Sequence, residues 1–329
     1  MKSWIILLLM ILISFAVKAK DYPVSDHYDG KIFFNPTQNQ LHSAWELIKW
    51  QMTAEDNLWP DHIPNKVYPL PVRSSENRAI ATFIGHATFL LQLKDLNVLT
   101  DPMFSERASP FKFIGPKRTR EPGVKMEELP KIDVVIISHN HYDHLDLASL
   151  NALDEKFHPL FLVPLGNEQL LKEAGIQNVR EMDWWEEHII REHKITFTPA
   201  QHWSARGLFD KCETLWGSYF IHSPDFKTYF AGDTGLSSHL ANIRLRLGAP
   251  DLSLLPIGAY DPQYFMKINH MTPEEAFTAH KDLNSTFSIG MHFGTFPFTD
   301  EKIQDPVERL KKLDPAVFVT LDQGESKTF

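Results

Sequence analysis

The sequence HNHYDHLD, residues 139–146, directly follows the apolar run at 132–137. A short apolar run of this kind predicts a buried strand, so the polar residues after it begin where that strand ends. His139, His141, Asp143 and His144 then offer three imidazoles and one carboxylate within six residues. One ion cannot easily bind four ligands so close in sequence, whereas two ions roughly 3.5–4 Å apart can share them, as in two-metal hydrolases.

Three further candidate ligands follow apolar runs elsewhere in the chain. They are His202 in TPAQHW, Asp233 in YFAGDTG and His292 in IGMHFGTF. An isolated histidine is usually an ordinary hydrogen-bonded residue, and we interpret His86, within FIGHATF, as a core histidine of this type. The cluster after residue 137, combined with His and Asp at later strand ends, indicates a metal centre without cysteine ligands.

Composition narrows the class of protein. The 329 residues are 43% hydrophobic and 23% charged, which is ordinary globular usage and too polar for a polytopic membrane protein. The formal net charge of −9 argues against a protein that binds nucleic acid through a broad basic surface. The single cysteine, Cys212, excludes an intrachain disulfide and a zinc site built from several cysteines. Apolar runs mixed with helical stretches predict an α/β chain with helices outside β-sheets.

The first residues have the features of a secretory signal peptide. Thirteen of the fourteen residues from Trp4 to Val17 are apolar, Lys2 precedes them, and Ala19 lies in a small-residue pattern. We therefore predict a signal peptide at residues 1–19 and an exported protein, periplasmic or in the cell envelope and peripheral to the membrane. The alternative is that the segment is kept as an anchor, although fourteen helical residues rise only about 21 Å.

Residues 20–75 read as an N-terminal extension. They contain five prolines and one helical stripe that includes Trp45 and Met52. We expect this stripe to pack on the main core, and the indoles of Trp45 and Trp50 leave contact with lipid as the alternative. A basic cluster at Lys117, Arg118 and Arg120 either meets anionic lipid head groups or lies in a solvated loop.

Blocks throughout the chain resemble the N-acyl-phosphatidylethanolamine-hydrolysing phospholipase D family, within the metallo-β-lactamase superfamily. The pattern HxHxDH with later His, Asp and His is common to the superfamily, whereas DWWEE (183–187), FMKINH (265–270) and HFGTF (292–296) are more specific. The similarity runs in the same order over roughly residues 30–329. Asn269 and Phe293 depart from the glutamine and tryptophan of the mammalian members, so substrate fit is where this chain differs most.

The resemblance implies an αββα four-layer sandwich for residues 76–329, the catalytic domain, and a centre of two Zn²⁺ ions. Imidazole-rich sites also accept other divalent transition metals. By residue-for-residue correspondence, one zinc is held by His139, His141 and His202, the other by Asp143, His144 and His292, and Asp233 bridges both. Asp101 and Asp146 are candidates either to orient a ligand imidazole or to cap a turn.

The same resemblance guides the remaining site predictions. Asp143 and His270 are the catalytic candidates, because Asp143 could assist proton transfer while His270, just before a capped helix that begins near Thr272, could bind phosphate or donate a proton. The candidate substrate contacts are Asn269, Tyr142, Trp203 and Arg206.

The implied reaction is hydrolysis of N-acyl-phosphatidylethanolamine to N-acylethanolamine and phosphatidic acid by a hydroxide bridging the two metals. The alternatives are a lactonase or β-lactamase, because the same hydroxide can attack a carbonyl carbon, and a non-enzymatic metal-stabilised envelope protein. The expected partner is phospholipid at a membrane surface and not nucleic acid. The sequence leaves open whether two copies form a homodimer, and it does not locate the groove for the acyl chains.

Overall fold

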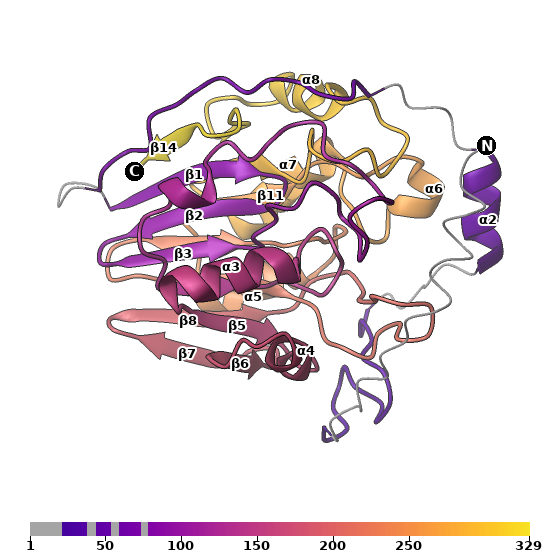
Figure 1. Cartoon of the computed structure of the whole chain (residues 1–329), viewed down its shortest axis with the longest axis horizontal. Coiled ribbons are helices and arrows are strands. Elements are labelled where there is room, and N and C mark those ends of the chain that lie inside the picture. The colour runs from indigo at the N-terminus through magenta and orange to yellow at the C-terminus, as the bar shows by residue number, and fades with distance from the viewer. Residues whose placement is uncertain (1–21, 38–43, 54–58, 74–77) are drawn as a thin grey trace.

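The computed structural model describes residues 22–37, 44–53, 59–73 and 78–329, which form two seven-stranded sheets (Figure 1). The first sheet has the order β14 (Ser326–Thr328), β1 (Ala79–Gly85), β2 (Thr88–Leu93), β3 (Leu96–Thr100), β4 (Val134–Ile136), β5 (Leu160–Pro164), β6 (Val179–Met182). The second has the order β13 (Phe318–Val319), β12 (Phe287–Met291), β11 (Leu252–Pro256), β10 (Lys227–Phe230), β9 (Ser218–His222), β8 (His193–Thr198), β7 (Glu187–Ile190).

Each sheet combines an antiparallel part with a parallel part. Strands β1, β2 and β3 pair antiparallel, and β3, β4, β5 and β6 pair parallel. In the second sheet β7 to β10 pair antiparallel, and β10 to β13 pair parallel. It follows that β1, β3 and β4 run in one direction in the first sheet, as do β8, β10 and β12 in the second. Their carboxyl ends lie at one edge of each sheet.

Helices cover the outer face of each sheet, which confirms the predicted αββα sandwich. Helices α3 (Leu147–Phe157) and α4 (Glu168–Glu173) pack on the first sheet through buried leucines. Helices α5 (His239–Leu247), α7 (Pro273–Leu283) and α8 (Asp305–Lys311) cover the second. A short helix, α6 (Gln263–Met266), and a 3₁₀ turn, η2 (Met126–Glu128), lie in connections. Strands such as β1, β4 and β11 are wholly buried because both of their faces are covered, which explains their continuous apolar sequences.

The start of α7 is fixed by local hydrogen bonds. The Thr272 hydroxyl accepts from the Glu275 N–H at 3.1 Å, the Glu275 carboxylate accepts from the Thr272 N–H at 3.0 Å, and Pro273 occupies the first turn. The predicted helix start is therefore confirmed. This cap also fixes the chain direction immediately after His270.

Part of the N-terminal extension lies against the core, because Tyr28 and Phe33 are buried within the main hydrophobic cluster. The prediction that the helical stripe packs on the core was wrong for Trp45 and Met52 of helix α2 (Ala44–Thr53), which are 70% and 75% exposed. Trp50 of α2 instead stacks on Phe265 of α6 with ring centroids 5.1 Å apart. The predicted signal peptide at 1–19 lies outside the described residues. Among the residues described, no helix combines the length and apolar character needed to cross a bilayer.

Candidate metal centre

The candidate ligands all follow strands whose carboxyl ends meet at one edge of the sandwich. The segment His139–His144 follows β4, while His202, Asp233 and His292 follow β8, β10 and β12. Polar side chains at these ends are brought together from distant parts of the sequence because the two sheets pack face to face. The structure therefore gathers all seven of the predicted ligands in one place.

Six of the predicted ligands fall into two adjoining groups, and within each group the possible ligand atoms lie within 4.8 Å of one another. One group contains His139, His141 and His202. The other contains Asp143, His144, His292 and one residue that was not predicted, His86.

Asp233 lies between these groups. Its Oδ2 atom is 3.2 Å from His144 Nε2, 3.1 Å from His292 Nε2 and 3.8 Å from His202 Nε2. His270 is also close, with Nδ1 3.9 Å from the same oxygen. This placement suits the bridging role that the family resemblance implies for Asp233.

In the three-histidine group, His139 and His202 are buried, His141 is partly buried, and the rings are uncharged. Burial lowers the pKa of His139 and of His202 well below the ordinary value. Burial also lowers the pKa of His141 to about 4. Neutral imidazoles have a lone pair available for a metal ion, so this group needs to lose no proton on binding.

In the second group, the neighbouring carboxylates outweigh the effect of burial on the histidine pKa values. Burial raises the pKa of Asp233, but the neighbouring His292 and His144 outweigh it and hold that pKa well below the ordinary value. For His292, burial lowers the pKa, but Asp233 and Asp143 outweigh it and raise the pKa to about 9. The pKa of His144 is likewise raised, by Asp233, Asp143 and Asp101 against the effect of burial. Without metal, these two imidazoles carry protons.

The donor set fits a divalent transition metal. Four of its buried atoms have no hydrogen-bond partner among the described residues, namely Asp233 Oδ1, His144 Nε2, His141 Nε2 and His292 Nδ1. Buried polar atoms are rarely left unsatisfied, and a cluster of them on imidazole and carboxylate groups is the chemistry of a metal site.

Asp101 orients a ligand, as predicted. Its carboxylate lies 2.7 Å from His144 Nδ1 and accepts the Ser138 N–H at 2.7 Å. Asp146 instead caps α3 and accepts the N–H of Ala148 at 3.3 Å, so its alternative role as a turn cap holds. An outer hydrogen bond of the Asp101 type fixes the orientation of a ligating imidazole.

His86 is a buried, hydrogen-bonded histidine, as predicted, but its partner is the candidate ligand Asp143, so it belongs to the surroundings of the metal centre. It is buried, but its Nε2 lies 2.8 Å from Asp143 Oδ2 and its ring centroid is 4.1 Å from that of His292. Burial lowers the pKa of His86 to about 3, so the ring is neutral and can donate to the carboxylate. The available signal was its position directly after strand β1, which is the same position that the other ligands have after their strands.

Backbone conformation also marks this edge. His86, Asp101 and His292 have φ angles of 56°, 33° and 59°, which non-glycine residues seldom adopt. The His292 N–H donates to the His86 carbonyl at 2.8 Å and ties two of these residues together. Unfavourable backbone conformations of this kind concentrate at functional sites.

The predicted substrate contacts surround the centre. The Trp203 ring lies 4.5 Å from that of His141, and the Asn269 carbonyl lies 3.1 Å from His202 Nδ1. Arg206 stacks on Tyr142, with its guanidinium carbon 4.0 Å from the ring centroid.

Arg206 also braces the metal-binding loop. Its guanidinium donates to the carbonyls of Asn140 at 2.8 Å and Leu145 at 2.9 Å, on either side of the ligand segment. Contact between Arg206 and a substrate stays a prediction.

The basic cluster does not form one surface patch. Arg118 is buried and donates to the carbonyls of Met103 and Ser105, and burial lowers its pKa to about 10. Lys117 pairs with Glu106 at 2.8 Å. Neither alternative for the cluster holds for Arg118, because this side chain points inward and supports a loop.

Two seven-stranded sheets, outer helices and a buried His/Asp centre at one edge define a metal-dependent hydrolase of the β-lactamase fold. The model of the beta-lactamase superfamily domain matches residues 96–293. The sequence is 37% identical to N-acyl-phosphatidylethanolamine-hydrolyzing phospholipase D 1 of Caenorhabditis elegans over 332 aligned residues, which cover 90% of this chain and 92% of that one. The chain belongs to the N-acyl-phosphatidylethanolamine-hydrolyzing phospholipase D family.

More distant relatives agree on the fold. A UPF0173 metal-dependent hydrolase of Solibacter usitatus is 31% identical, over 74% of this chain and 97% of that protein. The structure of a possible metal-dependent hydrolase from Veillonella parvula superposes with a TM-score of 0.65 at 18% identity, over 77% of this chain and all of that one. An isothiocyanate hydrolase from Delia radicum gut bacteria gives 0.62 at 22% identity, over 76% of this chain and 99% of that one.

Proposed function

We propose that this protein is a zinc-dependent phospholipase D that hydrolyses N-acyl-phosphatidylethanolamine to N-acylethanolamine and phosphatidic acid. The observation that carries the proposal is the pair of adjoining ligand groups around Asp233, in a chain similar over 90% of its length to a relative named for this reaction. The family-specific residues around His270 and His292 lie at the same centre, since both rings are within 5.5 Å of each other.

The proposed centre has two zinc ions. His139, His141 and His202 would hold one ion, Asp143, His144 and His292 the other, and Asp233 would contact both. Bound zinc would supply a water of lowered pKa near neutral pH and positive charge to stabilise a phosphodiester in its transition state.

His270 is proposed to bind the phosphate. It is 13% exposed and lies between His202 and His292, with ring centroids 5.2 Å and 5.5 Å away. Burial lowers the pKa of His270 to about 4, so near neutral pH it is a poor proton donor but still has one N–H to give to a phosphate oxygen. Between the two roles predicted from the sequence, phosphate binding is therefore the better supported.

Asp143 is proposed to hold its neighbours in place as well as to ligate. Its Oδ2 lies 2.8 Å from His86 Nε2, 3.2 Å from His144 Nε2 and 3.4 Å from His292 Nε2. The surrounding imidazoles, His144 above all, outweigh the effect of burial and keep the pKa of Asp143 well below its ordinary value. An ionised carboxylate in this position can accept a hydrogen bond from the attacking water.

Exposed apolar side chains near the centre are proposed to contact the lipid surface. Phe209 is 77% exposed, on the loop that follows Trp203, and Trp45 is 70% exposed on α2. Helix α2 stacks on α6, which leads to His270, and the two helices lie at the same end of the sandwich (Figure 1). Aromatic side chains in such positions suit the interface of a bilayer. The predicted signal peptide, together with this surface, supports a peripheral location in the cell envelope.

Substrate comparison tests the proposal. The purified zinc-loaded protein is incubated with vesicles containing N-acyl-phosphatidylethanolamine, with a chromogenic β-lactam and with an acyl lactone, and products are followed by mass spectrometry. We expect N-acylethanolamine and phosphatidic acid, and loss of both products after chelation. Lactone or lactam hydrolysis without lipid cleavage would support the alternative carbonyl hydrolase and exclude the phospholipase.

A further inference from the structure

In each ligand histidine, one ring nitrogen faces the metal centre and the other points away from it. The second nitrogen has a hydrogen-bond partner in some of these histidines but not in others. A histidine that binds a metal normally directs its other ring nitrogen to a hydrogen-bond partner, which fixes the tautomer and the ring orientation. Three ligands have such a neighbour within 3.1 Å: His144 has Asp101, His139 has Ser138 and His202 has the Asn269 carbonyl. The Nδ1 atom of His292 is buried and has no partner among the described residues.

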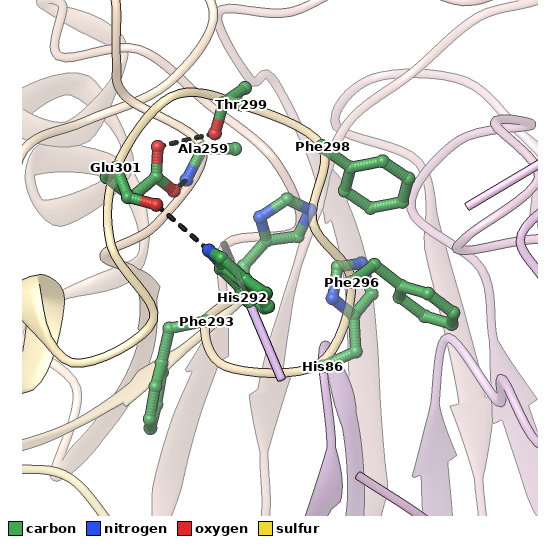
Figure 2. Close-up of a pocket in the computed structure, with 9 residues that line it drawn as sticks. His86, Ala259, His292, Phe293, Phe296, Phe298, Thr299 and Glu301 are labelled. Carbon is green, nitrogen blue, oxygen red and sulfur yellow. Dashed lines mark hydrogen bonds between the residues drawn. The ribbon is translucent and has the colours of Figure 1, made fainter. Parts of the chain in front are cut away.

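A small cavity lies directly beside His292. Its volume is about 10 Å³, and Phe296, Phe298 and Glu301 contribute to its walls (Figure 2). A cavity of this volume is the size of one water molecule. The aromatic rings in the wall offer few hydrogen-bond partners. The polar side chains in the wall therefore determine whether a water molecule is held there.

The polar wall opposite His292 is the carboxylate of Glu301. This residue is only 5% exposed. The Ala259 N–H donates to Oε1 at 2.5 Å, and the Thr299 hydroxyl donates to Oε2, as the dashed lines in Figure 2 show. The Asp261 N–H lies 3.4 Å from Oε2. These donors hold the carboxylate in a fixed position at the cavity, where a buried charge needs hydrogen-bonding neighbours.

We propose that one water molecule occupies this cavity and links the Nδ1–H of His292 to the Glu301 carboxylate. Glu301 is then a positioning residue: through the water it keeps a proton on Nδ1, so that Nε2, 3.4 Å from Asp143 and 3.1 Å from Asp233, is the nitrogen that a metal ion would take. The linkage does for His292 what the direct contact with Asp101 does for His144. The inference rests on the proposed metal centre, because its consequence is support for one of the two ions.

The direct test is a crystal structure of the zinc-loaded protein at a resolution that shows buried water. We expect one ordered water within hydrogen-bond distance of both His292 Nδ1 and the Glu301 carboxylate. An empty cavity, or a water that contacts neither group, overturns the proposal. A protein that binds no metal at all would instead contradict the proposed function, so the two failures are distinguishable.

A variant tests the consequence for metal binding. Glu301→Gln keeps the size of the side chain and removes its charge, and zinc affinity is measured by competition with a chelator. We expect the affinity for one of two ions to fall about 10- to 100-fold, with the other unchanged. Thr299→Val is the comparison variant, because it removes one donor to Glu301 but leaves the carboxylate, so its loss of zinc affinity should be clearly smaller than that of Glu301→Gln.

Equal affinities in Glu301→Gln and the wild type would overturn the proposal, as would equal losses in both variants, which would indicate a purely structural loop effect. Unfolding midpoints of both variants are measured alongside. If Glu301→Gln does not fold, the water seen or not seen in the wild-type crystal decides the question.

Discussion

The two ligand groups of the candidate metal centre adjoin each other but differ in charge. In the group of His139, His141 and His202, burial lowers the pKa values, so the imidazoles are neutral. In the other group, Asp143 and Asp233 outweigh burial and raise the pKa values of His144 and His292, whereas burial lowers the pKa of His86 to about 3. Imidazoles in both groups are desolvated, so the pKa values of His144 and His292 are raised because each of these two rings lies close to both Asp143 and Asp233.

This difference indicates two modes of metal binding within one centre. The three-histidine group is ready to bind, because a divalent ion displaces no proton from it. The second ligand group, which contains His144 and His292, is held together by hydrogen-bonded ion pairs with carboxylates when metal is absent. A metal ion that binds there must displace the protons of these imidazoles. Asp233 lies between the two groups. Substitution of Asp233 should therefore affect metal binding by both groups.

The largest effect is expected for Asp233→Ala. Its Oδ2 atom is within 3.8 Å of nitrogens in both groups, so removal of the carboxylate takes a ligand from each ion. Loss of a ligand should exceed the roughly 10- to 100-fold effect of losing an outer partner. We expect metal content well below that of the wild type and activity at background, measured by elemental analysis and lipid hydrolysis. Two ions retained at full occupancy would show that Asp233 is not shared.

Proton release on metal binding sharpens the comparison. At pH 7 the His292 imidazole, with a pKa of about 9, and His144 are protonated, whereas His141, with a pKa of about 4, is neutral. One zinc should therefore bind without proton release and the other should release about two protons. The affinity of the second ion should fall as the pH is lowered below 9, because protons compete for the same nitrogens.

Calorimetry in buffers of different ionisation enthalpy measures this release directly. A His292→Gln variant is the control, since it removes one of the titrating rings and should reduce the proton count of the second event by about one. Equal release for the two ions would contradict the assignment of charge to one group.

Much of the centre could be predicted from the sequence because strand ends are visible in it. Ligands such as His139 and His292 follow apolar runs that read as buried strands, and parallel strand ends meet at one edge. His86 was missed because the apolar residues on both sides of it suggested a core position. The tight turn with positive φ, which points its ring to Asp143, depends on packing against the second sheet.

Long side chains were harder to predict than ligands. Arg118 looked like a group for anionic lipid, yet it is buried and donates to main-chain carbonyls. The direction of a flexible side chain is decided by tertiary neighbours that local sequence does not specify. The water-sized cavity beside Glu301 was also beyond prediction, because it is a property of packing between loops.

His270 tests where the centre ends. It is near Asp233, as His292 is, but burial lowers its pKa, and Nδ1 is 3.9 Å from the carboxylate instead of 3.1 Å. We expect His270→Ala to keep two zinc ions and to lower kcat by about 100-fold, within the range for a group that acts on the reacting atoms. His270→Gln, which retains an N–H donor, should recover part of the rate. Loss of zinc in His270→Ala would make His270 a ligand and exclude the proposed role.

The smallest effect concerns His27, which serves as a control outside the centre. Like His292 it lies between two carboxylates, with Nδ1 2.6 Å from Asp26 and Nε2 2.8 Å from Asp183. Burial lowers the pKa of His27, but the hydrogen bonds with Asp183 and Asp26 outweigh it and raise the pKa above the ordinary value. Because folding raises the pKa of His27, its ion pairs with the two carboxylates stabilise the protein fully below the unfolded pKa of about 6.5. This contribution is lost as the pH rises through the folded pKa of His27.

We therefore expect His27→Gln to lower the free energy of unfolding by roughly 1 kcal/mol at pH 5.5 and by less at pH 8.5, measured by urea denaturation. Adding zinc should not change this difference, because among the described residues no second imidazole lies in a ligand group with His27. A difference independent of pH would show that His27 acts through its stacking on Trp184, 4.4 Å away, and not through its charge. A difference that zinc abolishes would mean that paired carboxylates alone can recruit metal to a histidine, and the contrast between the two groups of the centre would then lose its basis.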